Sequence, residues 1–248
     1  MSAQRRACRA HDHRVDQQPA LVLHAYPWRE TSLILEAFTR DYGRLTLVAR
    51  GAKRPASQFR GLLSPFAPLL MSWSGRGDIK TLTRVEWWGG VAPLRGDALF
   101  AGFYLNELLV RLLARGDPHE RLFARYLETL GALAHEVPPP EAALRGFELA
   151  LLRETGHAPA FDQCADGAPV RAEYVYRLDL QRGLVRVQVA DDASPVISGR
   201  TALALARADF NQPEVLAESK RLLRYLIGYH LNGQPLNTRR ILQDLNRL

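Results

Sequence analysis

Cysteine is scarce in this 248-residue sequence, which limits the compartments and metal sites open to it. Cys8 and Cys164 are the only two, too few for a disulfide framework, and this fits a reducing compartment. Cys8 could join His11 and His13 around a metal, but a structural zinc site takes four ligands at defined spacing. We therefore expect neither a disulfide framework nor a bound metal.

Long apolar runs are also missing. The run at residues 105–113 is broken by Asn106, Glu107 and Arg111 and is far shorter than the roughly 20 residues that cross a bilayer. The first 19 residues are polar and lack the apolar segment of a signal peptide. We expect a cytoplasmic chain with no membrane partner. Its 47% hydrophobic composition and its length predict a buried core and two domains.

Signatures of catalysis and of nucleotide binding are absent too. The sequence contains no GxxxxGK[ST], HExxH or GxSxG pattern, no paired CxxC and no acidic cluster suited to Mg²⁺. The Gly-Arg-Gly-Asp turn at residues 75–78 lacks the third glycine and the strand-to-helix context of a dinucleotide fingerprint. Residues far apart in sequence could still assemble a site, so an enzyme stays open as an alternative. We expect no catalytic residue and no cofactor.

Negative charge is scarce in one part of the chain, and the net charge of +7 lies there. Residues 1–19 carry four Arg and two Asp, residues 20–91 carry ten basic and five acidic residues, and residues 92–248 carry nineteen of each. A preference for Arg codons could raise the pI uniformly, since only three of the 33 basic residues are Lys. It would not segregate the charge, so the pattern predicts a nucleic-acid-binding N-terminal domain.

The most basic stretch, residues 44–60 (RLTLVARGAKRPASQFR), contains no acidic residue. It begins as a strand with Leu45, Leu47 and Ala49 on one face and opens at Gly51 into a loop. Such a loop can be merely solvated surface, or it can grip a polyanion. Together with cations of neighbouring strands and turns, it predicts a DNA-binding surface made of Arg29, Arg44, Arg50, Lys53, Arg54, Arg60, Arg76, Lys80 and Arg84.

Short strands follow a polar segment that we expect to be a disordered basic tail, residues 1–19. Apolar and aromatic residues between turn signals predict five strands, at residues 20–26, 32–38, 44–50, 62–73 and 80–88. Five strands in residues 20–92 are typical of an OB-fold barrel, which binds single-stranded nucleic acid. An SH3-like barrel has a similar strand count and stays open at this point.

Aromatic side chains in the barrel could stack on bases. The candidates are Trp28, Phe59, Trp73, Trp87 and Trp88. We expect at least three of the five to be core residues, and Trp28, in a turn beside Arg29, to be the most exposed.

Residues 93–248 change to helical periodicity and predict a helical bundle. Helices are expected from Asp97 to Gly116, after Asp117-Pro118, after the prolines at 138–140, at residues 213–231 and at residues 238–245. Between residues 157 and 200 the alternation at 174–180 and 184–189 predicts an inserted β-hairpin. The fold class is therefore α+β.

Several stretches, taken in order, closely resemble the RecO family of bacterial recombination mediators. They are residues 20–38 (ALVLHAYPWRETSLILEAF), 43–53 (GRLTLVARGAK), 63–70, 75–82 (GRGDIKTL), 104–108 (YLNEL) and 147–152 (FELALL). The similarity runs from Ala20 to the C-terminus. Because the motifs are many and in order, they are far more specific together than any one of them.

This resemblance implies an N-terminal OB fold that binds single- and double-stranded DNA and a helical domain that docks partners. It implies DNA repair in the RecF pathway, in which such proteins anneal complementary strands and, with RecR, help RecA displace single-strand binding protein (SSB). We expect a cytoplasmic, nucleoid-associated monomer. Some members hold zinc through four cysteines after the third helix; this chain has only Cys164 there, so no zinc is expected. A generic OB module for RNA is the alternative.

The third predicted helix carries the predicted docking site for the acidic, apolar C-terminal tail of SSB. Arg145, Leu149 and Leu152 form a second stripe beside the one expected to face the bundle. Gly146 lies between the stripes, and a helical glycine suggests that something approaches the backbone closely. The second stripe could instead simply pack against the rest of the protein.

Overall fold

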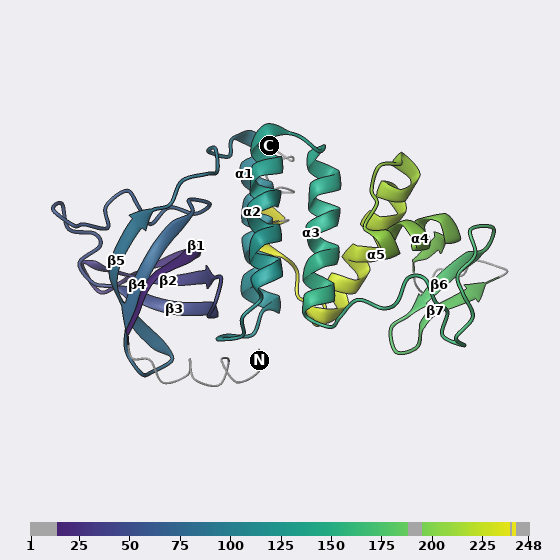
Figure 1. Ribbon diagram of the computed structural model, residues 1–248, viewed down its shortest axis with the longest axis horizontal. Coiled ribbons are helices and arrows are strands. Elements are labelled where there is room, and N and C mark those ends of the chain that lie inside the picture. The colour runs from purple at the N-terminus through teal and green to yellow at the C-terminus, as the bar shows by residue number, and fades with distance from the viewer. Residues whose placement is uncertain (1–13, 188–194, 239, 242–248) are drawn as a thin grey trace, which may run out of the picture. The chain divides into compact units, whose positions relative to one another are not determined.

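The computed structural model describes residues 14–187, 195–238 and 240–241. The elements in chain order (Figure 1) are β1 (Arg14–Trp28), β2 (Ser32–Thr39), β3 (Gly43–Ala49), β4 (Leu69–Ser74), β5 (Ile79–Trp87), α1 (Gly96–Leu112), α2 (Glu120–His135), α3 (Pro140–Glu154), β6 (Val175–Asp179), β7 (Gly183–Val187), β8 (Val196–Ser198), α4 (Gly199–Arg207) and α5 (Pro213–His230). This order confirms the predicted α+β class.

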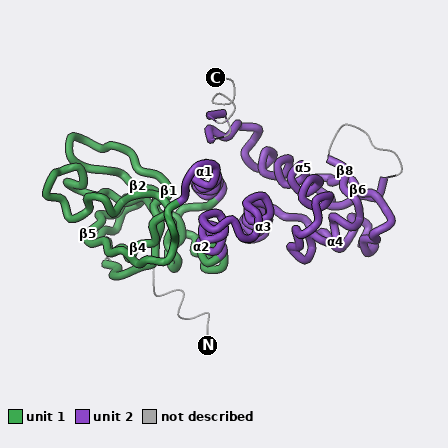
Figure 2. The backbone as a smooth tube through the Cα atoms, turned by 90° about the horizontal axis from the view of Figure 1, so that it is seen from above, with its two compact units in different colours: residues 1–93, 113–124 green, residues 94–112, 125–248 purple. Residues whose placement is uncertain are grey.

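The chain divides into two compact units, coloured separately in Figure 2. Unit 1 comprises residues 1–93 and 113–124, and unit 2 comprises residues 94–112 and 125–248. The first break falls after residue 93, and the sequence predicts a domain boundary after residue 92. The return of residues 113–124 to unit 1 was not predicted.

Unit 1 contains a closed five-stranded barrel with strand order β1-β2-β3-β5-β4. All neighbouring strands are antiparallel except β3 and β5, where Thr46 lies beside Ile79 and Val48 beside Thr81. The inward side chains of the strands fill the barrel with Leu, Val, Ala, Met71 and Trp73. This arrangement is the OB fold, and it settles the choice that strand count left open.

Two strand boundaries differ from the predictions. β1 begins at Arg14, so the predicted tail is wrong for residues 14–19, because Arg14 and Val15 pair with Ser74 and Trp73 of β4. The proposed metal ligands Cys8, His11 and His13 lie outside the described residues. β4 begins at Leu69, not at residue 62, because the preceding residues continue a series of turns.

Unit 2 is built on packed helices and a small sheet. α3 packs on α1 and α5, and α4 packs on α5. The sheet has the order β7-β6-β8, with β6 and β7 forming the predicted hairpin. β8 and α4 were not predicted; Ser198 caps α4 by accepting a hydrogen bond from the Thr201 amide. Among the described residues, no helix is both long and apolar enough to cross a membrane.

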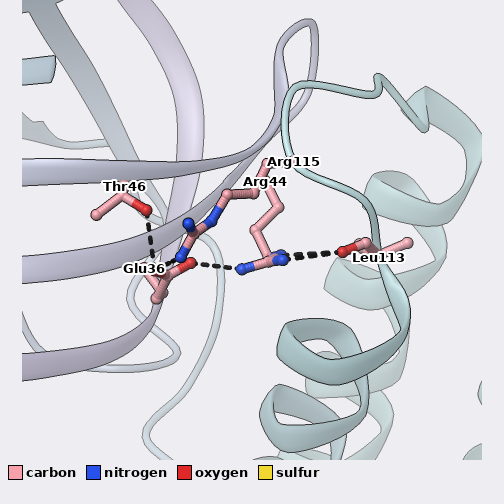
Figure 3. A network of polar contacts seen from close by, with 5 residues as sticks. All are labelled: Glu36, Arg44, Thr46, Leu113 and Arg115. Atoms are coloured by element: carbon pink, nitrogen blue, oxygen red, sulfur yellow. Dashed lines mark hydrogen bonds and ion pairs between the residues drawn. The ribbon is translucent and has the colours of Figure 1, made fainter. Parts of the chain in front are cut away.

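A buried carboxylate ties the segment after α1 to the barrel wall (Figure 3). Glu36 of β2 accepts hydrogen bonds from Arg44 Nη1 at 2.7 Å, Thr46 Oγ1 at 2.9 Å and Arg115 Nη2 at 2.8 Å. Arg44 also donates through Nε and Nη2 to the Leu113 carbonyl, at 3.1 and 3.0 Å. Three donors on one buried acceptor therefore connect β2, β3 and residues 113–115.

The backbone reinforces this junction at Gly43. The Gly116 amide donates to the Arg44 carbonyl at 2.9 Å. A Cβ on Gly43 would lie 2.0 Å from the carbonyl oxygen of Asp117, and its φ of +66° is one that side chains disfavour. Glycine is therefore required where β3 meets the returning segment.

We predict that Glu36→Ala destabilises the protein by about 3 to 5 kcal/mol, because it leaves the Arg44 guanidinium buried without its carboxylate. The Arg44 side chain is only 12% exposed, whereas the Arg115 side chain is 57% exposed. Arg115→Ala is the matched control and is expected to cost about 0 to 1 kcal/mol. Urea unfolding measures both. Equal losses in the two variants would contradict the central role of the buried pair.

Candidate nucleic-acid interface and partner pocket

The loop between β3 and β4 presents a group of unpaired cations. Arg50, Lys53, Arg54 and Arg60 are all exposed, and within the described ranges none has a carboxylate within ion-pair distance. Successive turns order the loop, with Arg54, Ser57 and Arg60 amides each donating to a carbonyl three residues earlier. Ala52 and Phe59 are buried in the barrel core and anchor it. The loop therefore holds its cations outward on an ordered backbone.

The turn between β1 and β2 lies against this loop. The Lys53 amide donates to the Thr31 carbonyl at 2.8 Å, and the Gly51 amide donates to Ser32 Oγ at 3.4 Å. Arg29 is exposed in the same turn, with its guanidinium 5.9 Å from the centroid of the Trp28 ring. The structure thus brings Arg29 together with the loop cations, as the sequence predicts.

The predicted cations of β5 and of the turn before it differ in how close they lie to the loop. Gln58 of the loop donates to the Thr83 carbonyl at 3.2 Å, which places Arg84 close to the loop, although Arg84 also pairs with Glu86. Lys80 lies beside Leu47, and its ammonium donates to the Gly77 carbonyl at 3.0 Å. Because β3 and β5 are parallel and Ile79 lies beside Thr46, the Arg76 turn before β5 lies toward the start of β3, whereas Lys80, beside Leu47, lies past the middle of β3.

Arg44 does not belong to this surface. Its guanidinium is largely buried and is taken up by Glu36 and the Leu113 carbonyl. The prediction that Arg44 contacts phosphate is therefore wrong, because its guanidinium is buried and already hydrogen-bonded within the protein. A strand pattern cannot show that an outward residue will be covered by a segment 69 residues away.

Three of the five candidate aromatics are on the surface. Trp28 is 45% exposed, Trp87 is 67% exposed and Trp88 is also exposed, while Phe59 and Trp73 are core residues. The expectation of at least three core residues is wrong, and Trp87 is more exposed than Trp28. Trp87 ends β5 just before Gly89 and Gly90, whose positive φ values carry the chain out of the sheet. The Gly89-Gly90 pair was therefore the feature of the sequence that could have predicted an exposed Trp87 at the end of β5.

Unit 2 contains a second candidate site, a pocket of about 930 Å³. Its walls come from α1, α3, α5 and the residues that follow α5. The apolar part includes Phe100, Leu144, Ile227 and Leu236, and the charged part includes Lys220, Arg224 and Arg240 against Asp97 and the Arg145–Glu148 pair. Glu107 holds the last wall by accepting hydrogen bonds from the Asn237 and Thr238 amides at 2.8 and 2.9 Å. The pocket combines an apolar floor with positive charge.

Arg145 lies in this pocket but is engaged inside the protein. Its guanidinium donates to Glu148, whose same oxygen accepts from Tyr104 Oη at 2.6 Å. Burial raises the pKa of Glu148, and the charge of Arg145 opposes that rise. Lys220 and Arg224, from α5, border the same pocket and are exposed.

The other two predicted docking residues are not accessible. Leu149 and Leu152 are both buried in the core of unit 2, so their predicted contact with a partner is wrong. Their stripe packs within the protein, which is the alternative that the sequence left open. The close approach expected at Gly146 is also internal: a Cβ there would lie 2.4 Å from Arg125 Nη2.

The described residues contain no cluster of three or more His, Cys, Asp or Glu side chains suited to a metal ion. Cys164 is a free thiol, half-buried in the β-sheet region of unit 2. Its carbonyl and amide are used by the local turn through Gly167 and Ala168.

Comparison with known proteins gives matches along nearly the whole chain. The family model for recombination protein O, N terminal, matches residues 14–91, and the one for recombination protein O, C terminal, matches residues 94–240. Proteins named DNA repair protein RecO include one from Ralstonia nicotianae, 54% identical over 96% of this chain and 87% of the relative. Another, from Polynucleobacter necessarius, is 52% identical over 95% of this chain and 98% of the relative.

The N-terminal match covers the barrel from the first residue of β1, and the C-terminal match covers both the helices and the small sheet. The two matches, in this order along the chain, cover every helix and strand that the structure describes. The chain therefore belongs to the RecO family of DNA repair proteins.

Proposed function

We propose that this protein binds single- and double-stranded DNA through the loop end of its barrel, anneals complementary strands and, with RecR, helps RecA replace SSB. In this proposal the protein acts as a cytoplasmic, nucleoid-associated monomer without catalysis. The observation that carries it is the group of exposed, unpaired cations Arg29, Arg50, Lys53, Arg54 and Arg60 on an ordered loop and turn. Cations that have no carboxylate partner are available to neutralise phosphates and release counterions.

Binding of purified protein to fluorescent DNA and RNA oligonucleotides, with and without SSB, tests the function as a whole. The proposal expects DNA binding and a further, SSB-dependent complex. A generic RNA module would bind RNA at least as well and would ignore SSB. No binding to either nucleic acid would contradict both functions.

The double substitution Lys53→Glu/Arg54→Glu reverses two charges of the β3–β4 loop and is expected to weaken binding to all DNA sequences alike. If both residues contact phosphate, the slope of log K against log salt on single strands should fall by about 1.4, at roughly 0.7 per phosphate. Arg76→Glu/Lys80→Glu makes the same charge change in the β4–β5 turn and at the start of β5, and serves as the control. An unchanged slope in the loop variant, or equal loss in the control, would exclude a localised interface.

Stacking of a base is assigned to Trp28 because its turn contacts the cationic loop. Trp28→Ala should cost about 1 to 3 kcal/mol of affinity for single-stranded DNA. Trp87 is more exposed and ends β5 beside Leu69, where the β3–β4 loop rejoins the sheet, so Trp87→Ala is the comparison variant and should lose less affinity than Trp28→Ala. Fluorescence titration at fixed salt measures both variants. A larger loss for Trp87 would move the stacking surface to the end of β5.

The unit 2 pocket is assigned to the C-terminal tail of SSB in place of the predicted Leu149 and Leu152 stripe. A tail that ends in a carboxylate and carries an apolar residue matches a pocket with Phe100 and Ile227 beside Lys220 and Arg224. Arg145→Ala is a poor probe, because it would leave Glu148 buried and unpaired at a cost of about 3 to 5 kcal/mol. Arg224 is the better probe because its side chain is exposed.

We predict that Arg224→Ala weakens binding of an SSB-tail peptide by about 1.5 to 3 kcal/mol, the range for a hydrogen bond to a charged group. Arg221→Ala is the control, because it removes an equal charge three residues earlier on α5 and Arg221 does not line the pocket. The Arg221→Ala variant should bind the peptide like the wild-type protein. Calorimetric titration of the peptide gives both values, and DNA affinity should be unchanged in each. Equal weakening by the two substitutions would place the tail elsewhere.

A further inference from the structure

A second hollow lies in the small β-sheet region of unit 2, distinct from the helical pocket. Its volume is about 520 Å³, inside the roughly 300 to 1,000 Å³ range of small-ligand pockets. One wall is the turn at residues 164–171 and the other is the β6–β7 hairpin. The space is large enough for a nucleotide unit but not for a folded domain.

Hydrogen bonds fix the two walls against each other. The Ala165 amide donates to the Leu184 carbonyl at 2.7 Å across the two walls, and within the turn the Cys164 amide donates to the Ala168 carbonyl at 2.8 Å. The Arg171 amide donates to Tyr176 Oη at 2.9 Å, and Tyr176 itself is buried. The hollow is therefore formed by backbone that hydrogen bonds hold in place.

The hollow is strongly positive although unit 2 as a whole is not. Arg171, Arg182 and Arg186 line it and are exposed, and Asp166 is the only carboxylate among its lining residues. Within the described part of the chain, none of these three guanidinium groups lies in an ion pair. Guanidinium groups suit phosphate oxygens through paired N–H donors.

One arginine also supplies a stacking surface. The Arg186 guanidinium lies 3.4 Å from the centroid of the Tyr174 ring, a cation–π contact that covers one face of the ring. Arginine planes and aromatic rings are the surfaces on which proteins stack unpaired bases. The Arg186–Tyr174 pair offers a flat surface for a base, and Arg171 and Arg182 in the same hollow offer charges for phosphates.

We propose that this hollow is a second contact for single-stranded DNA, in which Arg171 and Arg182 meet phosphates and a base stacks on the Arg186–Tyr174 pair. The inference rests on the proposed function only in taking DNA as the ligand. It uses none of the barrel residues. A strand held at two separate places on one protein gains affinity when it is long enough to reach both.

Cys164 reports directly on occupancy, because it lines the hollow and is one of only two cysteines in the chain. In full-length Cys8→Ser protein, the rate of Cys164 modification by a thiol reagent is measured with increasing oligo-dT. The expected result is protection that rises in parallel with binding. The same concentration of phosphate supplied as dTMP is expected to protect far less, and equal protection by dTMP would identify a small-phosphate site and overturn the proposal.

Arg182→Glu/Arg186→Glu should abolish this protection and lower the salt slope for single-stranded DNA by about 0.7 for each phosphate lost. Arg200→Glu/Arg207→Glu makes the same charge change on α4, outside the hollow, and should leave protection intact. Unchanged protection in the hollow variant, or no protection in the parent protein despite DNA binding, would overturn the second contact alone. Failure of the parent protein to bind DNA at all would overturn the proposed function as well.

Discussion

The Glu36 carboxylate is the constraint on which the N-terminal unit depends. It is buried in the barrel wall and satisfies Arg44, Thr46 and Arg115 together, and through Arg44 it reaches the Leu113 carbonyl. A buried charge of this kind is tolerable only when its hydrogen bonds are complete. These bonds hold β2, β3 and residues 113–115 together, and Gly43 is required beside them because a Cβ there would clash with the Asp117 carbonyl.

The same principle divides the arginines into two groups, those paired with a buried carboxylate and those exposed without an ion-pair partner. Arg44 and Arg145 are both adjacent to buried carboxylates, Glu36 and Glu148, and contribute to folding. Among the described residues, Arg50, Lys53, Arg54 and Arg60 of the β3–β4 loop and Arg171, Arg182 and Arg186 of the small-sheet hollow have no such ion-pair partner. Since an exposed arginine keeps its charge available to solvent and ligand, the candidate DNA contacts are those that the fold leaves unpaired.

Sequence patterns predicted the elements well because local physics determines them. Alternation located the barrel strands, helical periodicity located α1, α3 and α5, and the Gln181-Arg182-Gly183 turn located the β6–β7 hairpin. The short β8 and α4 were missed because three residues of strand and a nine-residue helix carry little periodicity. Their position depends on Gly199, where a Cβ would lie 1.9 Å from the Arg171 carbonyl oxygen.

The candidate sites were less predictable, because availability is a tertiary property. Arg50, Lys53 and Arg54 could be recognised from the basic loop alone, since no acidic residue lies near them in sequence. Arg44 differs from them only through contacts between elements: its ion-pair partner Glu36 lies on the neighbouring strand β2, and the Leu113 carbonyl that it also binds lies 69 residues away. Leu149 and Leu152 likewise look like an exposed stripe only until the packing of α1 and α5 on α3 is known.

Hydrogen–deuterium exchange with and without single-stranded DNA tests the central claim most directly, because it locates contacts without changing the sequence. The account predicts that DNA slows exchange in the Trp28–Ser32 turn and in residues 50–60, where the unpaired cations lie. Exchange that is unchanged in both segments at saturating DNA, with protection confined to other strands of the barrel, would contradict it.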